Sequence, residues 1–364
     1  MKNTISKEMM QSRLKERQED LRGPYFRDQT AIIHSGAFRR LKHKTQAFFA
    51  PQNDHICTRI EHVLHVATVA ETICKGLNNA GWQLDTEIAY AAGLGHDLGH
   101  APFGHSGETA IDNLSDKGFE HELNSLRVVD KLTHDGHGIN LTFAVRDGIM
   151  CHCGERFEQY LEPDTSITDL AKKISRDRIP ATWEGCAVRF ADKIAYFGRD
   201  IEDALVAKII TRDDIPERIS SKLGGSNGEI INTLVIDIIQ NSIKEGKIGF
   251  SDRYYELMVE IKDFNYTKIY TSLNKSNNEK YCINIVNALF AHLLDNYDNI
   301  IDGNHNNLAL DKGFQRYVAS MDYLYKRENA DKTQIVIDYV SGMTDNYALA
   351  SFQEITLPKP VKFF

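Results

Sequence analysis

The segment that most constrains this chain is GHDLGHAPFGHSGE, residues 95–108, where a stretch with helical periodicity gives way to glycines and a proline. The residues that predict a tight loop after that helix are Gly99, Pro102, Gly104 and Gly107. The segment places His96 next to Asp97, an imidazole and a carboxylate at a helix end. Mixed nitrogen and oxygen ligands suit Mn, Fe, Zn or Co, and Mg less naturally. Two residues cannot complete a metal site, so the other ligands must come from other segments.

Helical periodicity is frequent along the rest of the chain, whereas the alternation typical of strands is scarce. Thr58 and Glu61 form a capping-box pattern that begins a helix running to about residues 76–81. Asp85 can cap the next helix, which should end near residues 95–99. Further helices are expected over 119–133, 185–207, 229–243 and 281–297, with polar breaks at 154–180, 224–228 and 302–313. The pattern predicts an all-α fold.

The chain has 364 residues, of which 42% are hydrophobic and 26% charged, a globular balance that can bury a large core. No break resembles a flexible linker, and no internal repeat is present. We therefore expect a single domain over 1–364, with a core at about 55–210 and a C-terminal helical part at about 228–364. The net charge of -8, without a dominant basic stripe, argues against binding of duplex DNA.

The sequence gives no sign of a membrane or secreted protein. No run of eighteen apolar residues occurs, and the charged N-terminal segment lacks the apolar core of a signal peptide. The six cysteines are too sparse for a disulfide framework. We therefore expect a cytoplasmic protein with reduced thiols.

Histidine is concentrated in one part of the chain, because twelve of the fourteen histidines lie in the first 152 residues. Two further ligands fit the pair His96 and Asp97. They are His62, in the first turn of the helix after Thr58, and Asp192, in the segment RFADKIAYFGRD. Two histidines and two aspartates from three helices are typical of a site in the core of a helical bundle. A lone histidine on a helix is usually a surface or hydrogen-bonded residue, so the prediction depends on the whole cluster.

Two alternatives to this ligand set stay open. Cys151, His152 and Cys153 could bind zinc, although no second cysteine pair lies nearby. His65 stands one helical turn after His62 and could be a ligand, but this spacing equally suits a supporting or surface position.

The order His62, His96-Asp97 and Asp192 resembles the H…HD…D signature of the HD-domain phosphohydrolase superfamily. The segment HDLGHAPFGHSGE is similar to the signature of the bacterial dGTP triphosphohydrolase family and its dNTPase-like members. Four other segments resemble that family in the same order: RDQTAIIHSGAFRRLKHKTQAFF (27–49), TRIEHVLHVA (58–67), GFEHELNSLRVV (118–129) and DYVSGMTDNYA (338–348). The resemblance covers nearly the whole chain and implies an HD-domain helical bundle with additional helices and loops.

Members of this family convert a dNTP in one step to a deoxynucleoside and inorganic triphosphate, by attack at the α-phosphorus. The resemblance thus implies a metal-dependent dNTP triphosphohydrolase, with dGTP among its substrates. It implies that the metal ligands are His62, His96, Asp97 and Asp192. The implied catalytic residues are His105 and Glu108, which position or activate the attacking water, and His100 and His121, which line the α-phosphate. The implied substrate-binding residues are Arg59 and Lys193 at the phosphates, and Gln46, Tyr196 and Asp200 around the deoxyribose.

General chemistry agrees with several of these roles. His105 and Glu108 are three residues apart, close enough for the carboxylate to orient the imidazole. Asp192, Tyr196 and Asp200 recur every fourth residue and so share roughly one helix face. The expected cofactor is Mn²⁺ or Mg²⁺, with Fe, Co or Zn as alternatives. From the resemblance we also expect a homo-oligomer, a tetramer or hexamer, and we keep an allosteric dNTP and single-stranded DNA open as further partners.

Three positions depart from the family pattern: Ala101 replaces a proline, His65 a glutamate and Asn346 an arginine. None of them is a predicted metal ligand, but Asn346 puts the base preference and the contacts between subunits in doubt. Two other functions stay open. One is another HD phosphohydrolase, such as a nucleotidase or phosphodiesterase, against which the KTQ motif (44–46) and DYVSGMTDNYA (338–348) argue. The other is a nucleotide sensor without catalysis, against which the intact metal and catalytic residues argue.

Overall fold

The computed structural model describes residues 1–48, 55–153, 157–173, 178–271, 273–304 and 308–357. It confirms the all-α fold, since eighteen α-helices account for most of the described residues. The strands of this described part are β1 (Tyr160–Leu161) and β2 (Ile248–Gly249), which pair antiparallel with Tyr160 opposite Gly249. None of the described helices combines the length and the apolar composition needed to cross a membrane.

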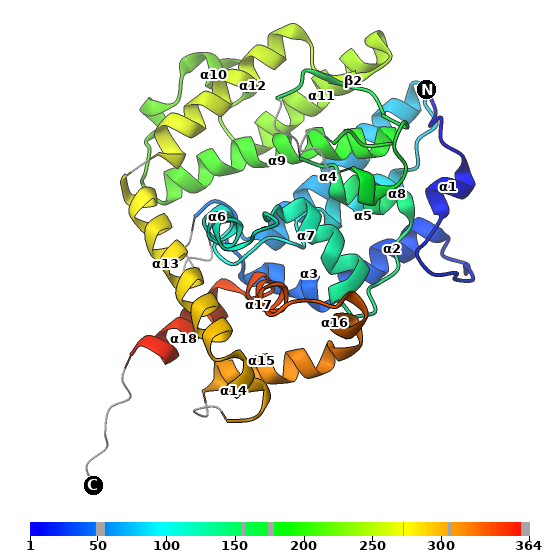
Figure 1. Ribbon diagram of the computed structural model, residues 1–364. Coiled ribbons are helices and arrows are strands. Elements are labelled where there is room, and N and C mark those ends of the chain that lie inside the picture. The colour runs from blue at the N-terminus through cyan, green and yellow to red at the C-terminus, as the bar shows by residue number, and fades with distance from the viewer. Residues whose placement is uncertain (49–54, 154–156, 174–177, 272, 305–307, 358–364) are drawn as a thin grey trace.

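Three helices form the centre of the molecule (Figure 1). They are α4 (Arg59–Asn79), α5 (Thr86–Gly95) and α9 (Trp183–Val206). Helices α10 (Glu217–Leu223), α11 (Asn227–Glu245) and α12 (Asp252–Phe264) join α4 and α9 in the main apolar core. Both caps that the sequence predicts are present. Thr58 and Glu61 form the capping box of α4, and Asp85 caps α5 by accepting a hydrogen bond from the backbone of the next turn.

The N-terminal part packs on the other side of α5. Its elements are α1 (Lys7–Gln11), α2 (Pro24–Ile33), α3 (Gly36–Arg40) and the 3₁₀ turn η1 (Leu41–His43). The same part also contains α7 (His121–Arg127), the π-helical turn η2 (Val128–Leu132) and α8 (Phe143–Met150). Apolar side chains from these elements surround α5 in a second buried cluster.

The C-terminal helices form a further layer. Helix α13 (Leu273–Asp295), yellow in Figure 1, runs from the upper helices to the lower ones. The remaining helices are α14 (Tyr297–Ile301), α15 (Ala309–Ser320), α16 (Asp322–Glu328), α17 (Lys332–Ser341) and α18 (Asp345–Thr356). Their apolar core also contains α6 (His105–Leu114), Ala101 and Phe103. The C-terminal layer therefore packs directly on the loop that follows the His-Asp pair.

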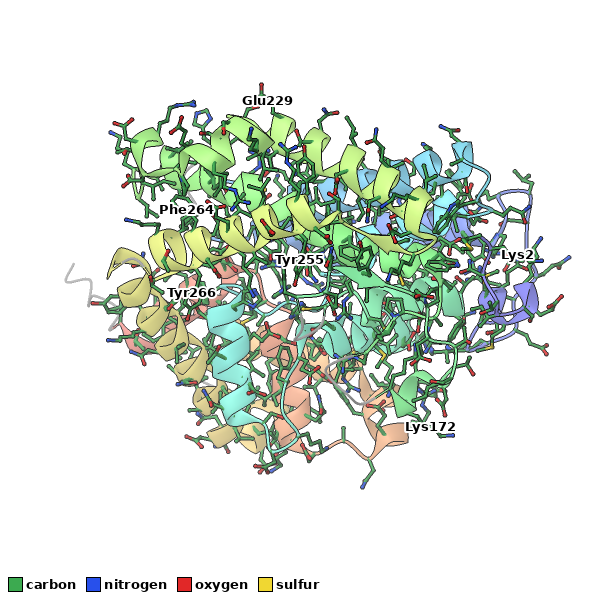
Figure 2. The ribbon with its side chains drawn as sticks, turned by 90° about the horizontal axis from the view of Figure 1, so that it is seen from above. Lys2, Lys172, Glu229, Tyr255, Phe264 and Tyr266 are labelled. Carbon is green, nitrogen blue, oxygen red and sulfur yellow. The ribbon has the colours of Figure 1, made fainter. Side chains whose placement is uncertain are left out.

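Helix α12 and the π-helical turn η5 (Asn265–Tyr270) lie over the bundle. Figure 2, which views the molecule from above, shows them as one long helix that carries Tyr255, Phe264 and Tyr266. Phe264 is buried in the main core, whereas Tyr266 is exposed. Tyr255 donates a hydrogen bond to the carbonyl of Phe157 at 2.8 Å and so ties α12 to the segment before β1.

Most predicted helices appear with small changes of boundary. The helices predicted at 119–133, 185–207 and 229–243 are α7 with η2, α9 and α11. The helix predicted at 281–297 begins earlier, because α13 starts at Leu273. The predicted break at 224–228 is too long, since α11 starts at Asn227. The breaks at 154–180 and 302–313 lie partly outside the described residues, and the second is too long, since α15 starts at Ala309.

The prediction that Gly107 belongs to the tight loop is wrong. Gly107 lies inside α6 and does not form a turn. It permits close packing, because a Cβ at this position would come within 1.9 Å of the Pro102 carbonyl oxygen. Gly104, by contrast, precedes α6 with φ of 60° and supplies the turn that the sequence predicts.

Candidate active site

Three helices deliver the residues predicted as metal ligands. His62 lies in the first turn of α4, His96 and Asp97 directly follow α5, and Asp192 lies in the middle of α9. Gly93 allows α5 to approach α4, because a Cβ at this position would come within 2.6 Å of a Cα atom of α4. The close approach of the two helices places the end of α5 beside the start of α4.

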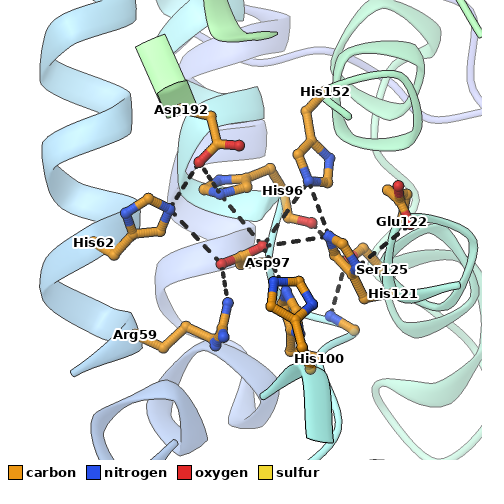
Figure 3. Close-up of polar contacts among 12 residues, drawn as sticks. Arg59, His62, His96, Asp97, His100, His121, Glu122, Ser125, His152 and Asp192 are labelled. Carbon is orange, nitrogen blue, oxygen red and sulfur yellow. Dashed lines mark hydrogen bonds and ion pairs between the residues drawn. The ribbon is translucent and has the colours of Figure 1, made fainter. Parts of the chain in front are cut away.

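The four side chains converge at one point of the bundle (Figure 3). His62 Nε2 lies 3.0 Å from Asp192 Oδ1 and 3.9 Å from Asp97 Oδ2. His96 Nε2 lies 3.4 Å from Asp97 Oδ1 and 3.8 Å from Asp192 Oδ1. The structure therefore brings together all four residues of the predicted ligand set.

The imidazole of His96 is suited to binding a cation. It is completely buried, and its Nδ1 donates a hydrogen bond to the carbonyl of Gly93 at 2.8 Å, which leaves the lone pair on Nε2. Among the described residues, this Nε2 atom has no hydrogen-bond partner. Burial lowers the pKa of His96 to about 4, so the ring is neutral at pH 7. A neutral, buried imidazole with an unused lone pair beside two carboxylates fits a divalent metal ion.

The two carboxylates of the set remain ionised although they are buried. Burial alone would raise the pKa of Asp97, but the neighbouring imidazoles and Arg59 lower it. In the same way, His62 and His96 outweigh burial and lower the pKa of Asp192. Arg59 donates a hydrogen bond to Asp97 Oδ2 and another, from Nε, to a backbone carbonyl at 3.0 Å. Arg59 therefore supports the carboxylate from the side of α4.

Glu108, in the first turn of α6, gathers the predicted catalytic residues. Its Oε2 accepts a hydrogen bond from His105 Nδ1 at 3.0 Å, and its Oε1 accepts one from His121 Nδ1 at 2.9 Å. His100 stacks on the ring of His121, with centroids 3.9 Å apart. His100 Nε2 also lies 3.3 Å from Asp97 Oδ1. The catalytic cluster is therefore continuous with the metal-ligand set.

Glu108 controls two imidazoles that differ in their surroundings. Burial alone would lower the pKa of His121, but the charge of Glu108 and its hydrogen bond raise this pKa to about 9. The His121 ring in the metal-free chain is therefore cationic at pH 7. The side chain of His105, by contrast, is 78% exposed. One carboxylate thus orients a buried cation and an accessible imidazole.

Most of these residues line a cavity of about 310 Å³; those in the lining are His62, Asp97, His100, His105, His121 and Asp192. The predicted substrate-binding residues in its lining are Gln46, Arg59, Tyr196 and Asp200. Tyr196 and Asp200 follow Asp192 along α9 at the predicted four-residue spacing and share its face. The hydroxyl of Tyr270, at the end of η5, donates a hydrogen bond to Asp200. The cavity therefore combines imidazoles and carboxylates with an amide and the rings of Phe103, Tyr196 and Tyr270.

Lys193 is the one predicted phosphate contact that the structure does not bring to the site. It is not among the described residues that line the cavity. Its ammonium binds Glu158 Oε2 at 2.8 Å and lies over the ring of Phe157. Successive residues of a helix are rotated by about 100°, so a residue directly after Asp192 turns away from the face that Asp192 shares with the cavity.

His152 joins the site although the sequence assigned it no role there. It follows α8, and its Nε2 lies 3.3 Å from His121 Nε2 and 3.9 Å from Asp97 Oδ1. Of its two neighbours, Cys153 lines the cavity and Cys151 is completely buried. The concentration of histidines before residue 153 was the signal that could have identified His152, but the flanking cysteines directed attention to zinc.

Two other residues that contact the site, Tyr270 and Lys44, were not predicted. Tyr270 lies in a segment without any motif, so no signal pointed to it. Lys44, in the KTQ motif, is buried and donates hydrogen bonds to the carbonyls of His100 and Ser341, the latter at 2.9 Å. Lys44 therefore ties the loop after the His-Asp pair to the end of α17. Asn346, by contrast, is exposed and does not belong to the described lining of the cavity.

A larger cavity, of about 470 Å³, lies between α3, η2 and the helices α15, α17 and α18. Its lining includes Arg40, Tyr317 and Tyr339, and none of the residues predicted for the site. The cavity lined by the predicted catalytic and metal-binding residues is therefore the smaller of the two.

Comparison with known families agrees with this arrangement. The model of the HD domain matches residues 59–238, and the model of the phosphohydrolase-associated domain matches residues 248–354. The first range contains the whole H…HD…D set and the cluster around Glu108. The second contains the helices that pack on the loop after the His-Asp pair. The fold and the site together define an HD-domain phosphohydrolase.

Similar proteins narrow this class further. A deoxyguanosinetriphosphate triphosphohydrolase-like protein of Caldanaerobacter subterraneus subsp. tengcongensis is 38% identical over 341 residues, which cover 94% of this chain and 87% of the relative. Proteins of the same description from Desulfatibacillum aliphaticivorans and Clostridium tetani are 35% and 33% identical, over 94% and 96% of this chain and 90% of each relative. The chain belongs to the family of deoxyguanosinetriphosphate triphosphohydrolase-like proteins.

Proposed function

We propose that this protein hydrolyses deoxynucleoside triphosphates, with dGTP among its substrates, to a deoxynucleoside and inorganic triphosphate. The observation that carries the proposal is the junction of two clusters in one cavity. Asp97 Oδ1 lies 3.3 Å from His100 Nε2, which joins the H…HD…D set to the histidines around Glu108. The description shared by the relatives supports the same reaction.

The residues that would hold the required divalent metal ion are His62, His96, Asp97 and Asp192. Mn²⁺ or Mg²⁺ is the proposed ion, and Fe, Co or Zn would also suit two imidazoles and two carboxylates. When bound, such an ion polarises the α-phosphate and lowers the pKa of a water molecule. Arg59 holds Asp97 in position by a hydrogen bond to Oδ2.

His105 and Glu108 would activate the attacking water. Glu108 accepts the Nδ1–H of His105 at 3.0 Å, which fixes the tautomer and leaves Nε2 free to accept a proton. His105 lines the cavity, and its exposed side chain is accessible to a substrate. Arg59 and the region of His121 supply positive charge, which stabilises the charge that develops as triphosphate departs.

The other side of the substrate would contact Gln46, Tyr196 and Asp200. Tyr196 offers a ring face for the deoxyribose, and Gln46 and Asp200 offer polar groups for the 3′-hydroxyl. The Oε1 atom of Gln46 is buried and has no hydrogen-bond partner within the described part of the chain, so it can accept one from a substrate. Tyr270 helps to fix the orientation of Asp200 by donating its hydroxyl to the carboxylate.

On the family resemblance, we also propose that the chain folds as one domain and assembles into a homo-oligomer, a tetramer or hexamer. Two links across the two matched regions support the single domain. Lys44 connects the loop of His100 to Ser341 in α17, and Asp345 in α18 binds the backbone N–H of Phe103 at 2.8 Å. A dNTP activator and single-stranded DNA remain further proposed partners, to be tested by binding measurements.

The test is to incubate the purified protein with each of the four dNTPs and Mn²⁺ or Mg²⁺, and to separate the products by ion-exchange chromatography. We expect a deoxynucleoside and intact triphosphate, and the four rates give the base preference. Release of phosphate or pyrophosphate would assign the protein to another branch of HD phosphohydrolases. Binding of metal and dNTP without any product would favour the nucleotide sensor.

A further inference from the structure

The larger cavity, of about 470 Å³, shares none of its lining residues with the cavity of the candidate active site. Its walls come from α3, from η2 and the residues after it, from α15, and from the region where α17 ends and α18 begins. Figure 1 shows α3, α15, α17 and α18 in the lower half of the molecule. Small-molecule sites in proteins have volumes of about 300–1,000 Å³. The cavity is therefore large enough for an organic ligand.

Arg40, at the end of α3, brings a positive charge to this cavity. Its guanidinium lies between two glycines, because a Cβ on Gly36 would lie 3.6 Å from Nη1 and a Cβ on Gly342 would lie 4.0 Å from Nη2. Burial against the cavity walls lowers the pKa of Arg40, and no carboxylate counteracts this effect. Within the described ranges of the chain, the guanidinium has neither a hydrogen bond nor an ion pair. A partly enclosed charge without a partner is unfavourable, so an anion in the cavity would stabilise it.

Aromatic and aliphatic side chains form much of the remaining lining. The rings of Tyr317 and Tyr339 lie with their centroids 5.0 Å apart, and the hydroxyls of Tyr339 and Tyr347 share a hydrogen bond of 2.8 Å. The aliphatic members are Leu98, Val128, Leu132, Met321 and Met343. Aromatic rings offer a large apolar surface, and methionine adapts its shape to a neighbour. The lining therefore suits a ligand that joins one anionic group to an aromatic body.

The carboxylates of the lining limit the negative charge that a ligand can carry. They belong to Asp135 and Asp338. Asp338 already binds Arg127, with hydrogen bonds of 2.8 and 2.6 Å, and Asp135 is exposed. A triphosphate, with its several negative charges, would meet one guanidinium and two carboxylates, whereas a single carboxylate matches the guanidinium alone. The charges therefore favour an organic monoanion over a nucleoside triphosphate.

We propose that this cavity is an effector site for a small organic anion that carries one carboxylate on an aromatic body. The planar guanidinium of Arg40 would bind both carboxylate oxygens, the geometry in which arginine pairs best with this group. The aromatic body would lie against Tyr317 and Tyr339. Binding in this cavity is independent of the proposed hydrolase function, whereas the effector role rests on it.

The effector role follows from backbone that the cavity shares with the active site. Leu98, in the wall, directly follows Asp97. The carbonyl of Ser341, another wall residue, accepts a hydrogen bond from Lys44 Nζ at 2.9 Å, and Lys44 also donates one to the carbonyl of His100. An occupant that fixes this wall therefore also acts on the loop that carries His100. Two sites that share such a segment influence each other's ligand affinity.

The experiment is isothermal titration calorimetry of the full chain with naphthalene-2-carboxylate and with naphthalene-2-carboxamide, which has the same shape without the charge. We expect one carboxylate to bind per wild-type chain, and the amide to bind about 10–100-fold more weakly because it lacks the charge-assisted hydrogen bonds. Arg40→Gln should lose this preference. The matched control is Arg39→Gln, an exposed residue of the same helix outside the described lining, which should keep it.

Enzyme kinetics test the effector role. Saturation with naphthalene-2-carboxylate should change KM for dGTP by about fivefold or more, the usual size of coupling between two sites. The change should occur in the wild type and in Arg39→Gln, and should be absent from Arg40→Gln. Because Arg40 does not line the active-site cavity, Arg40→Gln without the ligand should keep the basal rate of dGTP hydrolysis.

Each contrary result has a definite meaning. Equal affinity for the two ligands, or no binding of the carboxylate, would overturn the site, and this comparison on the wild type decides even if Arg40→Gln does not fold. An unchanged preference in Arg40→Gln would place the ligand elsewhere and would also overturn it. Binding without a change in KM would overturn the effector role. Absence of any dNTP hydrolysis would overturn the proposed function and with it the effector role, but not the binding site, because calorimetry needs no turnover.

Discussion

Glu108 and His121 are joined twice, because Glu108 Oε1 accepts hydrogen bonds from both the backbone N–H of His121 and its ring Nδ1, at 2.8 and 2.9 Å. The other oxygen of Glu108 accepts the Nδ1–H of His105 at 3.0 Å. One carboxylate in the first turn of α6 thus positions an exposed imidazole and a buried one. This arrangement agrees with two different proposed roles: His105 activates the attacking water, and His121 lies at the phosphate end of the cavity.

The first prediction concerns His105. His105→Ala removes the proposed base and leaves the candidate metal site intact, since His105 is not one of its proposed ligands. We expect turnover of dNTP to fall about 10²–10⁴-fold, the usual effect of losing an acid–base group, while binding of Mn²⁺ and of dNTP is retained. Single-turnover kinetics and equilibrium dialysis measure the two effects. The control is His137→Ala at the surface, and wild-type turnover in His105→Ala would exclude this residue from the mechanism.

The second prediction concerns Asp97, one of the four proposed metal ligands. Asp97→Ala should reduce bound Mn²⁺ to less than one ion per chain, because the carboxylate lies beside both histidines of the proposed ligand set, His62 and His96. Elemental analysis after dialysis is the measurement. The substitution also leaves Arg59 buried without its partner, so Asp97→Asn, which keeps the shape, is the companion variant. The exposed Asp302 supplies the control, and wild-type metal content in both Asp97 variants would refute the ligand assignment.

The parts of this site that the sequence predicts correctly depend on contacts between residues that are close together in the chain. Thr58, Glu61 and Asp85 cap two helices by contacts within one turn. The sequence alone therefore located the helix that carries His62 and the helix that ends directly before His96. The pairing of His105 with Glu108 is likewise a contact within one helical turn. Such interactions need no knowledge of the tertiary fold, and the structure contains all of them.

The misses arose where tertiary packing decides. Lys193 stands next to Asp192 in the sequence, but helical rotation turns it to Glu158. His152 and Tyr270 join the site through the packing of α8 and η5, which no local pattern describes. Gly107 reads as a turn residue, yet its role is the close approach of α6 to the Pro102 carbonyl. In each case the sequence shows the residue type but does not show which residues lie beside it in the fold.

The third prediction concerns Asp345, which links the C-terminal layer to the site. Its Oδ2 accepts hydrogen bonds from the backbone N–H and the hydroxyl of Thr45, at 2.7 and 2.5 Å, and its Oδ1 accepts the N–H of Phe103 at 2.8 Å. Asp345→Asn places an amide donor against one of these N–H groups. Leaving a buried donor unpaired costs about 1–3 kcal/mol, so urea denaturation should show a loss of stability of that size.

The same variant should also slow catalysis, because Thr45 precedes Gln46 and Phe103 lies two residues before His105. We expect kcat/KM for dNTP to fall further than in Asp302→Asn, an exposed control on the same C-terminal part. A variant with wild-type stability and wild-type kcat/KM would show that the carboxylate of Asp345 does not hold the loop after the His-Asp pair in place.

The fourth prediction concerns the pH dependence of stability. Asp203, on α9, is buried, and its Oδ2 accepts the N–H of Cys57 at 3.1 Å, whereas its Oδ1 has no hydrogen-bond partner in the described ranges. Burial raises the pKa of Asp203 to about 7, against an ordinary value of 3.8. The unfolded chain therefore ionises first. The contribution of Asp203 to stability is fully present below about pH 4 and is lost as the pH rises to about 7.

Asp203→Asn removes this titration and keeps an oxygen for the N–H of Cys57. The difference in unfolding free energy between the variant and the wild type should therefore shift in favour of the variant as the pH rises from about 4 to about 7, and should stay constant above that range. Urea denaturation at a series of pH values measures the difference directly, and the exposed Asp302→Asn should show no such trend. A constant difference across the whole series would mean that Asp203 titrates near its ordinary value in the folded chain. A shift in the opposite direction would mean that the folded state stabilises the ionised carboxylate, as it would if a cation reached the unpaired Oδ1 atom.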